Sequence, residues 1–213
     1  MDEALPAGHH MTAMASKAED VVGLYRRRGL AWASARGERL TEAAWLDRFL
    51  GLLPPRPAIL DLGCGSGDPI GYYFIDQGCE LTGVDTSPDL LALCAAKFPS
   101  ADWRLADMRA LSLGRAFDGI LAWDSFFHLD HDDQRAMFPI FRAHAGPGAA
   151  LMFTTGPAHG VAIGELESEP LFHASLGPDE YRDLLDQHDF DVIAHVVEDP
   201  ACGRHTIWLA QLR

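Results

Sequence analysis

One short stretch of the chain, ILDLGCGSGDP, combines three glycines with two acidic residues. Gly63, Gly65 and Gly67 stand at alternate positions between Asp61 and Asp68, directly after an apolar run. Glycines in this arrangement let a ligand approach the backbone closely. A dinucleotide-binding loop would have glycine at position 68, and a phosphate-binding loop would continue into Gly-Lys-Ser/Thr. The carboxylates instead favour a ligand that carries positive charge, because they would compete with a phosphate for the backbone N–H groups.

Two further acidic residues follow apolar runs. Asp85 ends the run LTGVD, eighteen residues after Gly67, and Asp107 follows WRLA. A carboxylate after the second strand can accept hydrogen bonds from both ribose hydroxyls. Asp107 can accept one from the exocyclic amine of adenine, while the Met108 backbone N–H donates to a ring nitrogen. S-adenosylmethionine fits this set, because it carries a sulfonium and an ammonium group and no phosphate.

These segments resemble those of the class I S-adenosylmethionine-dependent methyltransferases of the small-molecule type. The resemblance runs from about Leu46 to the C-terminus and is carried by ILDLGCGSG, LTGVDTSPDLL, WRLADMRAL and FDGILAWDSFFHL. It implies S-adenosylmethionine as the cofactor. It also implies transfer of a methyl group by in-line displacement to a small molecule, with oxygen or nitrogen as the expected acceptor atom.

The resemblance assigns cofactor contacts residue by residue. The glycine loop and the acid before it hold the methionyl end, the next acid holds the ribose, and the third holds adenine. Aromatic residues on an N-terminal lid can cover the cofactor, although ordinary helix packing explains them equally well. The predicted cofactor-binding residues are Asp61, Gly63, Cys64, Gly65, Gly67, Asp85, Thr86, Asp107, Met108, Ala122, Trp123, Tyr25 and Trp32. Thr86 departs from the family pattern, in which an apolar side chain commonly packs on adenine.

The segment WDSFFHLD offers groups for the acceptor side. Its Asp124 and His128 follow the strand that borders the expected methyl position, and a base is needed only if the acceptor must lose a proton. His159 is a second candidate base. The alternatives are a packed or capping histidine at 128 and a solvated loop histidine at 159. The predicted catalytic residues are therefore His128, His159 and Asp124, and the predicted substrate-binding residues are Phe126, Phe127 and His173.

Elements that would position these residues can be read from the alternation of apolar runs and helical patterns. Strands are predicted at 58–62, 81–84, 103–105, 117–123, 149–154, 190–197 and 205–212, and core helices at 68–75, 88–97, 130–144 and 178–188. The last two strands are too close for a crossover helix, so they should be antiparallel. The predicted fold is α/β, a Rossmann-like, doubly wound, mostly parallel seven-stranded sheet with an antiparallel C-terminal strand pair. Gly156–His173 is predicted to be a long loop over the site.

The N-terminal quarter, residues 1–53, is predicted to be organised differently from the rest of the chain. Residues 1–16 lack periodicity and are expected to form a disordered tail. Residues 17–53 are predicted to form a helical lid, with one helix at 17–28 and another that opens at Thr41. Residues 54–213 are predicted to form the methyltransferase catalytic domain.

Composition limits the partners. The chain has 213 residues, with 17 basic against 31 acidic residues and a net charge of −14, so nucleic acid is not expected as a partner. Its four cysteines and ten histidines show no zinc-like spacing, so no metal is predicted. No run approaches about 18 apolar residues, so no membrane span is expected. The expected state is a cytoplasmic monomer or homodimer, and the alternative function is a non-catalytic S-adenosylmethionine-binding sensor or interaction module.

Overall fold

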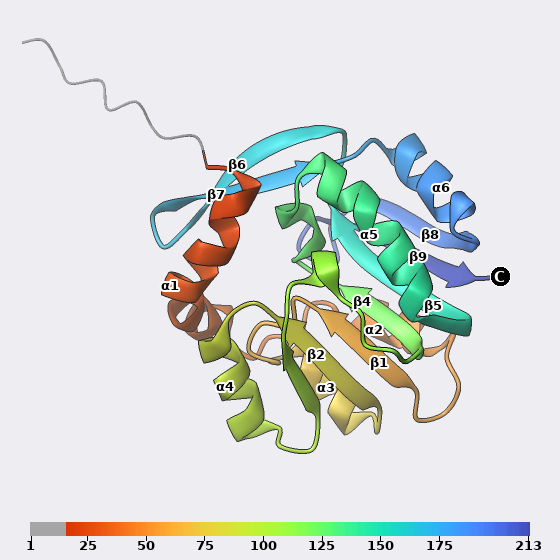
Figure 1. The fold of residues 1–213 in the computed structure, drawn as a ribbon, viewed down its shortest axis with the longest axis horizontal. Coiled ribbons are helices and arrows are strands. Elements are labelled where there is room, and N and C mark those ends of the chain that lie inside the picture. The colour runs from red at the N-terminus through yellow and green to blue at the C-terminus, as the bar shows by residue number, and fades with distance from the viewer. Residues whose placement is uncertain (1–15) are drawn as a thin grey trace, which may run out of the picture.

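The computed structural model describes residues 16–213, so nearly all of the predicted N-terminal tail lies outside the described residues. Within that range, seven strands form one sheet in the order β3-β2-β1-β4-β5-β9-β8 (Figure 1). These strands are β1 (Ala58–Leu62), β2 (Glu80–Asp85), β3 (Asp102–Leu105), β4 (Phe117–Ala122), β5 (Ala145–Thr155), β8 (Phe190–Asp199) and β9 (His205–Leu212).

Helices cover both faces of this sheet (Figure 1). They are α1 (Ala18–Arg36), α2 (Ala43–Leu50), α3 (Ile70–Asp76), α4 (Pro88–Lys97), α5 (His131–His144) and α6 (Pro178–Gln187), with short 3₁₀ turns η1 (Met108–Ala110) and η2 (Phe126–His128). Neighbouring residues of β1 pack into opposite cores, Ile59 with α2 and α3 and Leu60 with α5 and α6. Burial on both faces explains why β1 reads as a continuous apolar run.

The topology confirms the predicted fold class. β1 pairs in parallel with β2 and β4, β2 with β3, and β4 with β5, whereas β9 is antiparallel to both β5 and β8. The direction in which the chain adds strands to the sheet reverses between β1 and β4. The strands β2 and β3 lie on one side of β1, and β4 and β5 lie on the other side. A ligand site is expected beyond the carboxyl ends of the strands at this reversal.

Helix α1 continues past the predicted end at Arg28 and reaches Arg36. Glycine weakens a helix, so Gly29 was a reasonable place to expect the end. Gly29 is instead buried against Leu90 of α4, where an added Cβ would lie 3.1 Å from the leucine side chain. The small residue therefore lets α1 approach α4 closely, and the extension places Trp32 over the glycine loop.

The prediction of a long loop at Gly156–His173 is wrong, because most of this segment forms a β-hairpin. The strands β6 (Gly160–Leu166) and β7 (Glu169–Ser175) make a separate two-stranded antiparallel sheet beside α1 (Figure 1). Its apolar residues Leu171 and Phe172 pack with Val21 and Leu24 of α1. The hairpin gains its core from a helix distant in sequence, which a local pattern does not reveal.

A buried amide anchors the hairpin to the sheet. The Gln134 side chain of α5 donates to the carbonyl oxygens of Leu129 and Ala174, each at 2.9 Å. The Tyr181 hydroxyl donates to the Gln134 carbonyl oxygen at 2.6 Å and accepts from the Leu176 backbone N–H at 3.0 Å. This network ties the end of β7 to α5 and α6.

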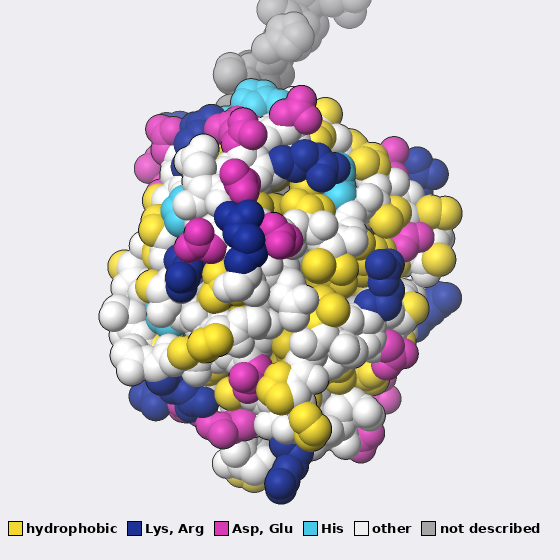
Figure 2. Space-filling view, turned by 90° about the vertical axis from the view of Figure 1, so that its right-hand side faces the viewer, with side chains coloured by type: hydrophobic (Ala, Val, Ile, Leu, Met, Phe, Trp, Pro, Cys, Tyr) yellow, Lys and Arg dark blue, Asp and Glu magenta, His cyan; other side chains and the backbone are white. Residues whose placement is uncertain are grey.

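The surface mixes charges of both signs. On the face shown in Figure 2, acidic and basic side chains are interspersed with hydrophobic ones, and basic side chains do not gather into one patch there. Among residues 16–213, no helix combines the length and the apolar character needed to cross a membrane.

Gln134→Leu should destabilise the fold by about 1–3 kcal/mol, because it removes the acceptor of the buried Tyr181 hydroxyl proton and the amide donor to the Leu129 and Ala174 carbonyl groups. Urea unfolding followed by circular dichroism measures this change. Gln187→Leu, at an exposed position of α6, is the matched control and should stay close to the parent protein. Equal stability of the two variants would contradict the anchoring role of Gln134.

Candidate active site

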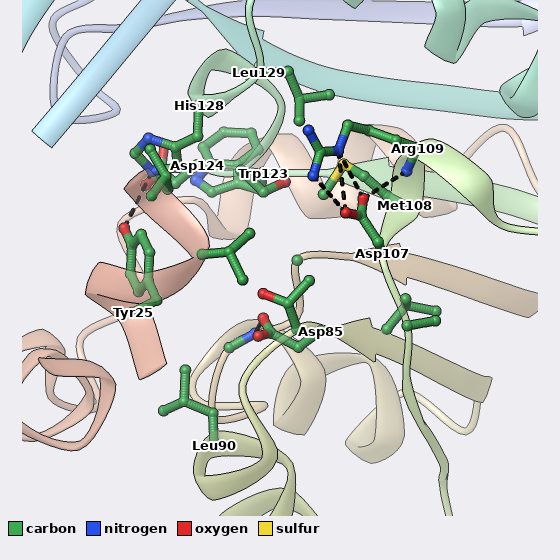
Figure 3. Close-up of a pocket in the computed structure, with 18 of the residues that line it drawn as sticks. Tyr25, Asp85, Leu90, Asp107, Met108, Arg109, Trp123, Asp124, His128 and Leu129 are labelled. Carbon is green, nitrogen blue, oxygen red and sulfur yellow. Dashed lines mark hydrogen bonds and ion pairs between the residues drawn. The ribbon is translucent and has the colours of Figure 1, made fainter. Parts of the chain in front are cut away.

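The main pocket opens at the carboxyl ends of β1, β2 and β4, under helix α1 (Figure 3). Many of the residues singled out in the sequence line it, namely Tyr25, Trp32, Gly63, Gly65, Asp85, Thr86, Asp107, Met108, Trp123, Asp124 and His128. In the view of Figure 3, Asp107 lies at one end and Asp124 and His128 lie at the other. Topology therefore brings together residues that stand over 100 positions apart in the chain.

The glycine loop forms the floor of the pocket. Gly63, Gly65 and Gly67 have φ values of 78°, 57° and 75°, a region that residues with a Cβ rarely adopt. A Cβ at position 63 would lie 2.3 Å from the Ser125 Cβ, and one at position 65 would lie 2.9 Å from the Trp32 ring. Both conformation and space therefore exclude side chains, which leaves a cradle for a ligand.

Asp85 ties the loop to the next helix. One of its carboxylate oxygens accepts from the Gly65 N–H at 2.9 Å, and the other accepts from the Ser87 N–H at 2.8 Å. Ser87 in turn caps α4, because its hydroxyl accepts from the Leu90 backbone N–H. Burial raises the pKa of Asp85, although these backbone hydrogen bonds act against the rise. Each oxygen keeps a second lone pair that can accept a ribose hydroxyl.

Asp61 lies beneath the loop and does not line the main pocket. Burial and the nearby charge of Asp85 raise the pKa of Asp61 to about 7. No ion pair of residues 16–213 involves either carboxylate. Two buried acids without a protein cation suit a cationic ligand. The third acid of the loop behaves differently, because Asp68 pairs with Lys97 at the surface, so it does not contribute the charge expected of it from the sequence.

Arg109 organises the opposite end of the pocket. Its guanidinium contacts both oxygens of Asp107 at 2.6–3.1 Å and reaches Asp133 of α5 at 2.9 Å. The hydrogen bonds from Arg109 hold the pKa of Asp107 below its ordinary value. Arg109 is the one Lys or Arg among the described residues that line the pocket, and two acids neutralise it. This arrangement suits a nucleoside better than a phosphate.

Helix α1 covers the pocket through side chains. The Tyr25 hydroxyl lies 3.1 Å from His128 Nε2, Trp32 lies over Gly65, and the Arg26 side chain donates to the Thr86 carbonyl at 3.0 Å. His128 Nδ1 lies 3.0 Å from the Phe172 carbonyl oxygen, which can only accept. The His128 proton is therefore on Nδ1, and Nε2 accepts from Tyr25. Burial lowers the pKa of His128 to about 4, so its ring is neutral near pH 7.

Asp124 follows β4 in a left-handed conformation, with φ 49°. Its backbone N–H donates to the Thr154 hydroxyl at 2.9 Å, and its carboxylate pairs with His205 Nε2 at 2.8 Å. Sequence reasoning missed His205. It begins β9, and because β9 runs antiparallel to β5, its first residues lie at the edge where the parallel strands end. The predicted antiparallel pair was the signal that could have located it.

A second cavity lies beyond His128, between η2, the end of β5 and the β6–β7 hairpin. Phe127, His159 and His173 line it, and none of its lining residues is a Lys, Arg, Asp or Glu. The His128 ring centroid is 4.8 Å from that of Phe127 and 5.0 Å from that of His173, so this ring stands between the two spaces. Phe126, by contrast, lies fully buried in the core with Phe138, Phe141 and Phe153 and lines neither space.

Three other predicted residues support the main pocket without lining it. Cys64 and Gly67 belong to the glycine loop, and Ala122 is buried at the end of β4. Several lining residues stand inside the segments that carry the resemblance but were not singled out in the sequence, among them Val84, Leu90, Ser125 and Leu129. Among residues 16–213, no group of three His, Cys, Asp or Glu side chains could hold a metal ion.

Residues 59–148 match the model of the methyltransferase domain family. A malonyl-[acyl-carrier protein] O-methyltransferase from Enterobacter lignolyticus (strain SCF1) is 35% identical over 113 residues, which are 51% of this chain and 43% of the relative. A dTDP-3-amino-3,4,6-trideoxy-alpha-D-glucopyranose N,N-dimethyltransferase from Streptomyces venezuelae is 27% identical over 101 residues, 46% of this chain and 42% of the relative. The chain thus spans less than half the length of these curated relatives.

Solved structures show the same fold. A 1,6-didemethyltoxoflavin-N1-methyltransferase from Burkholderia thailandensis, with S-adenosylhomocysteine bound, has a TM-score of 0.69 at 22% identity and covers 100% of this chain and 93% of its own. A magnesium protoporphyrin IX methyltransferase from Synechocystis PCC 6803, with S-adenosylmethionine bound, has a TM-score of 0.71 at 16% identity. The match covers 95% of this chain and 100% of that methyltransferase. Residues 59–148 therefore match a methyltransferase domain, and the fold of the chain is that of these solved methyltransferases.

The raised pKa of Asp61 predicts an unusual pH dependence of stability. The folded protein keeps this proton up to a pH of about 7, whereas an unfolded chain releases it at about 4. Asp61 therefore makes the ligand-free protein less stable as pH rises between these values. Asp61→Asn should remove this loss of stability. At pH 8 its free energy of unfolding should exceed that of the parent protein by up to about 4 kcal/mol.

Urea unfolding at pH 5 and pH 8 measures this change in stability. The control variant is Asp76→Asn, which changes an exposed carboxylate. Parallel pH profiles of the parent and Asp61→Asn would contradict burial of an ionisable Asp61.

Proposed function

We propose that this protein is an enzyme that transfers a methyl group from S-adenosylmethionine to a small-molecule acceptor. The observation that carries the proposal is Asp85, a buried carboxylate that braces the glycine loop and still lines the main pocket. The match of residues 59–148 to the methyltransferase domain family supports it, as do solved methyltransferases of the same fold with S-adenosylmethionine or S-adenosylhomocysteine bound.

The residues present fit this cofactor. Asp107 would receive the adenine amine, Asp85 the ribose hydroxyls, and the glycine loop with Asp61 beneath it the methionyl end. Gly63 and Gly65 line the pocket with backbone alone, so a ligand there would meet no side chain from these two positions. The absence of a free Lys or Arg among the described lining residues agrees with a ligand that has no phosphate.

When bound, S-adenosylmethionine supplies a methyl group on a sulfonium, which an acceptor lone pair attacks in line while sulfur keeps the C–S electron pair. The protein then contributes mainly orientation and exclusion of water. Tyr25 and Trp32 close the pocket from above, and Asp124 faces the end where the methyl group would lie. His128 Nε2 is engaged by Tyr25, so His128 would serve as a base only after this hydrogen bond opens.

We assign the acceptor to the second cavity, with its reactive atom reaching past His128. Phe127 and His173 are 5.0 Å apart between ring centroids, and His159 stacks on His131 at 4.5 Å. A lining of rings and small residues without Lys, Arg, Asp or Glu favours a flat, neutral portion of the acceptor. The relatives named as O- and N,N-methyltransferases support oxygen or nitrogen as the acceptor atom.

Calorimetric titration with S-adenosylmethionine, S-adenosylhomocysteine and NAD tests the cofactor, and a screen of metabolite extracts for S-adenosylhomocysteine release tests transfer. We expect the first two ligands to bind and NAD not to bind. Tight binding without release from any extract would favour the alternative function, a sensor or interaction module.

Asp85→Ala should weaken S-adenosylhomocysteine binding by roughly 1–3 kcal/mol, because two ribose hydroxyls lose their partner. Asp85→Ala also leaves the two backbone N–H groups that bond to Asp85 without their acceptor. Asp85→Asn should weaken binding less, because its amide keeps one acceptor oxygen, but it should not match the parent protein. Calorimetry measures the dissociation constants, and Asp76→Asn serves as the control. An unchanged constant for Asp85→Ala would overturn the cofactor assignment.

Phe127→Ala and His173→Ala should lower turnover at least about ten-fold by removing one wall of the acceptor cavity. Affinity for S-adenosylhomocysteine should change little, because neither side chain lines the main pocket. The measurement is the rate of S-adenosylhomocysteine release with an active extract. Full turnover in both variants would place the acceptor elsewhere.

A further inference from the structure

His205 lies between two groups that can only accept hydrogen bonds. Its Nδ1 is 2.7 Å from the Cys202 carbonyl oxygen. Its Nε2 is 2.8 Å and 3.1 Å from the two carboxylate oxygens of Asp124. Neither a carbonyl nor an ionised carboxylate donates a proton, so both ring nitrogens of His205 must carry one. The geometry therefore defines an imidazolium ion.

The surroundings support this charge. Burial alone lowers the pKa of His205, but the hydrogen bond and the charge of Asp124 outweigh it and raise that pKa to about 9. Glu42, at the start of α2, adds a smaller effect in the same direction and is itself paired with Arg36. The Trp123 ring packs beside the imidazolium at 5.3 Å between centroids.

Asp124 carries this pairing to the wall of the main pocket. Its left-handed backbone is held by the Thr154 hydroxyl, and about a third of its side chain stays exposed. Its charge acts on Tyr25 and His128 of the main pocket and on His173 of the second cavity. The carboxylate lines the main pocket close enough to His173 of the second cavity for its charge to act on that ring, and backbone strain of this kind concentrates at functional sites.

We propose that His205 is a positioning residue, an imidazolium that fixes the Asp124 carboxylate at the wall of the main pocket so that it receives an acceptor with an N–H or O–H donor. This inference rests on the proposed function for its chemistry, but the ion pair itself can be tested without it. Lone pairs of Asp124 that His205 does not use remain for the acceptor.

The arrangement also separates orientation from proton removal. Both nitrogens of His205 are engaged as donors, so this ring has no lone pair with which to take a proton from the acceptor. A proton lost after methyl transfer would pass to water or remain on an amine product. His205 thus aligns the acceptor through Asp124 and does not itself remove a proton from it.

Two-bond ¹H–¹⁵N spectra of the histidine side chains test the ion pair in the full chain, with His205→Gln identifying the signals. We expect His205 to be doubly protonated at pH 7.5 and its pKa to fall by at least about one unit in Asp124→Asn. His188→Gln, which removes a histidine bonded to a helix carbonyl far from the pocket, should leave these signals unchanged. A neutral His205 at pH 7.5 would overturn the proposal.

Benzylamine and benzoate, matched in ring and size, test the acceptor class in the presence of saturating S-adenosylhomocysteine. Benzylamine should shift the His205 signals, and the shift should be lost in Asp124→Asn; benzoate should cause none. If the two probes shift the His205 signals equally, or if benzylamine does not shift them, the proposal that Asp124 receives an N–H or O–H donor is wrong. Failure of the parent protein to bind S-adenosylhomocysteine would refute the proposed function, while the ligand-free spectra would still decide the state of His205.

Discussion

The pocket depends on one constraint, which is that Asp85 must remain buried while it holds two backbone N–H groups and faces a ligand. The hydrogen bonds to Gly65 and Ser87 fix the glycine loop and the start of α4 relative to β2. They also offset the free energy of burying a carboxylate. Gly65 has a φ of 57° and no side chain, which lets the Trp32 ring lie directly against it, and its N–H bond to Asp85 makes the loop conformation and the position of Asp85 depend on each other.

Closure of the pocket follows from the approach of α1 to this frame. Gly29 lets α1 pack on Leu90, and the residues one turn to either side then contact the loop and η2. Arg27 and Arg28 hold the same helix to Glu169 of the hairpin, at 2.9 Å and 2.6 Å. Exposed ion pairs of this kind contribute little stability. The apolar contacts of Val21 and Leu24 with the hairpin therefore account for most of the docking of α1.

The sequence was sufficient for the sheet and for the parts of the pocket built from local motifs. The first two parallel strands are short, largely apolar runs, of which β1 is followed by Gly63 and β2 ends in Asp85, so both Asp85 and the loop could be placed by topology. It was insufficient where an element depends on a distant partner. The hairpin packs on α1, Phe126 is drawn into an aromatic core, and Asp68 finds Lys97, all through contacts across the fold. The acceptor side was predicted least well for this reason.

The distribution of charge connects the two ends of the site. Asp107 is neutralised by Arg109 and Asp124 by His205, whereas Asp61 and Asp85 between them have no protein cation among the described residues. Protein cations thus pair with the acids at the two ends of the pocket. The two acids at the centre remain available to a cationic ligand. A cationic ligand that binds at the centre would allow Asp61 to ionise, because opposite charge favours the charged form. Binding and ionisation would then reinforce each other, which couples occupancy of the pocket to the protonation state of a residue that the ligand-free fold keeps protonated up to a pH of about 7.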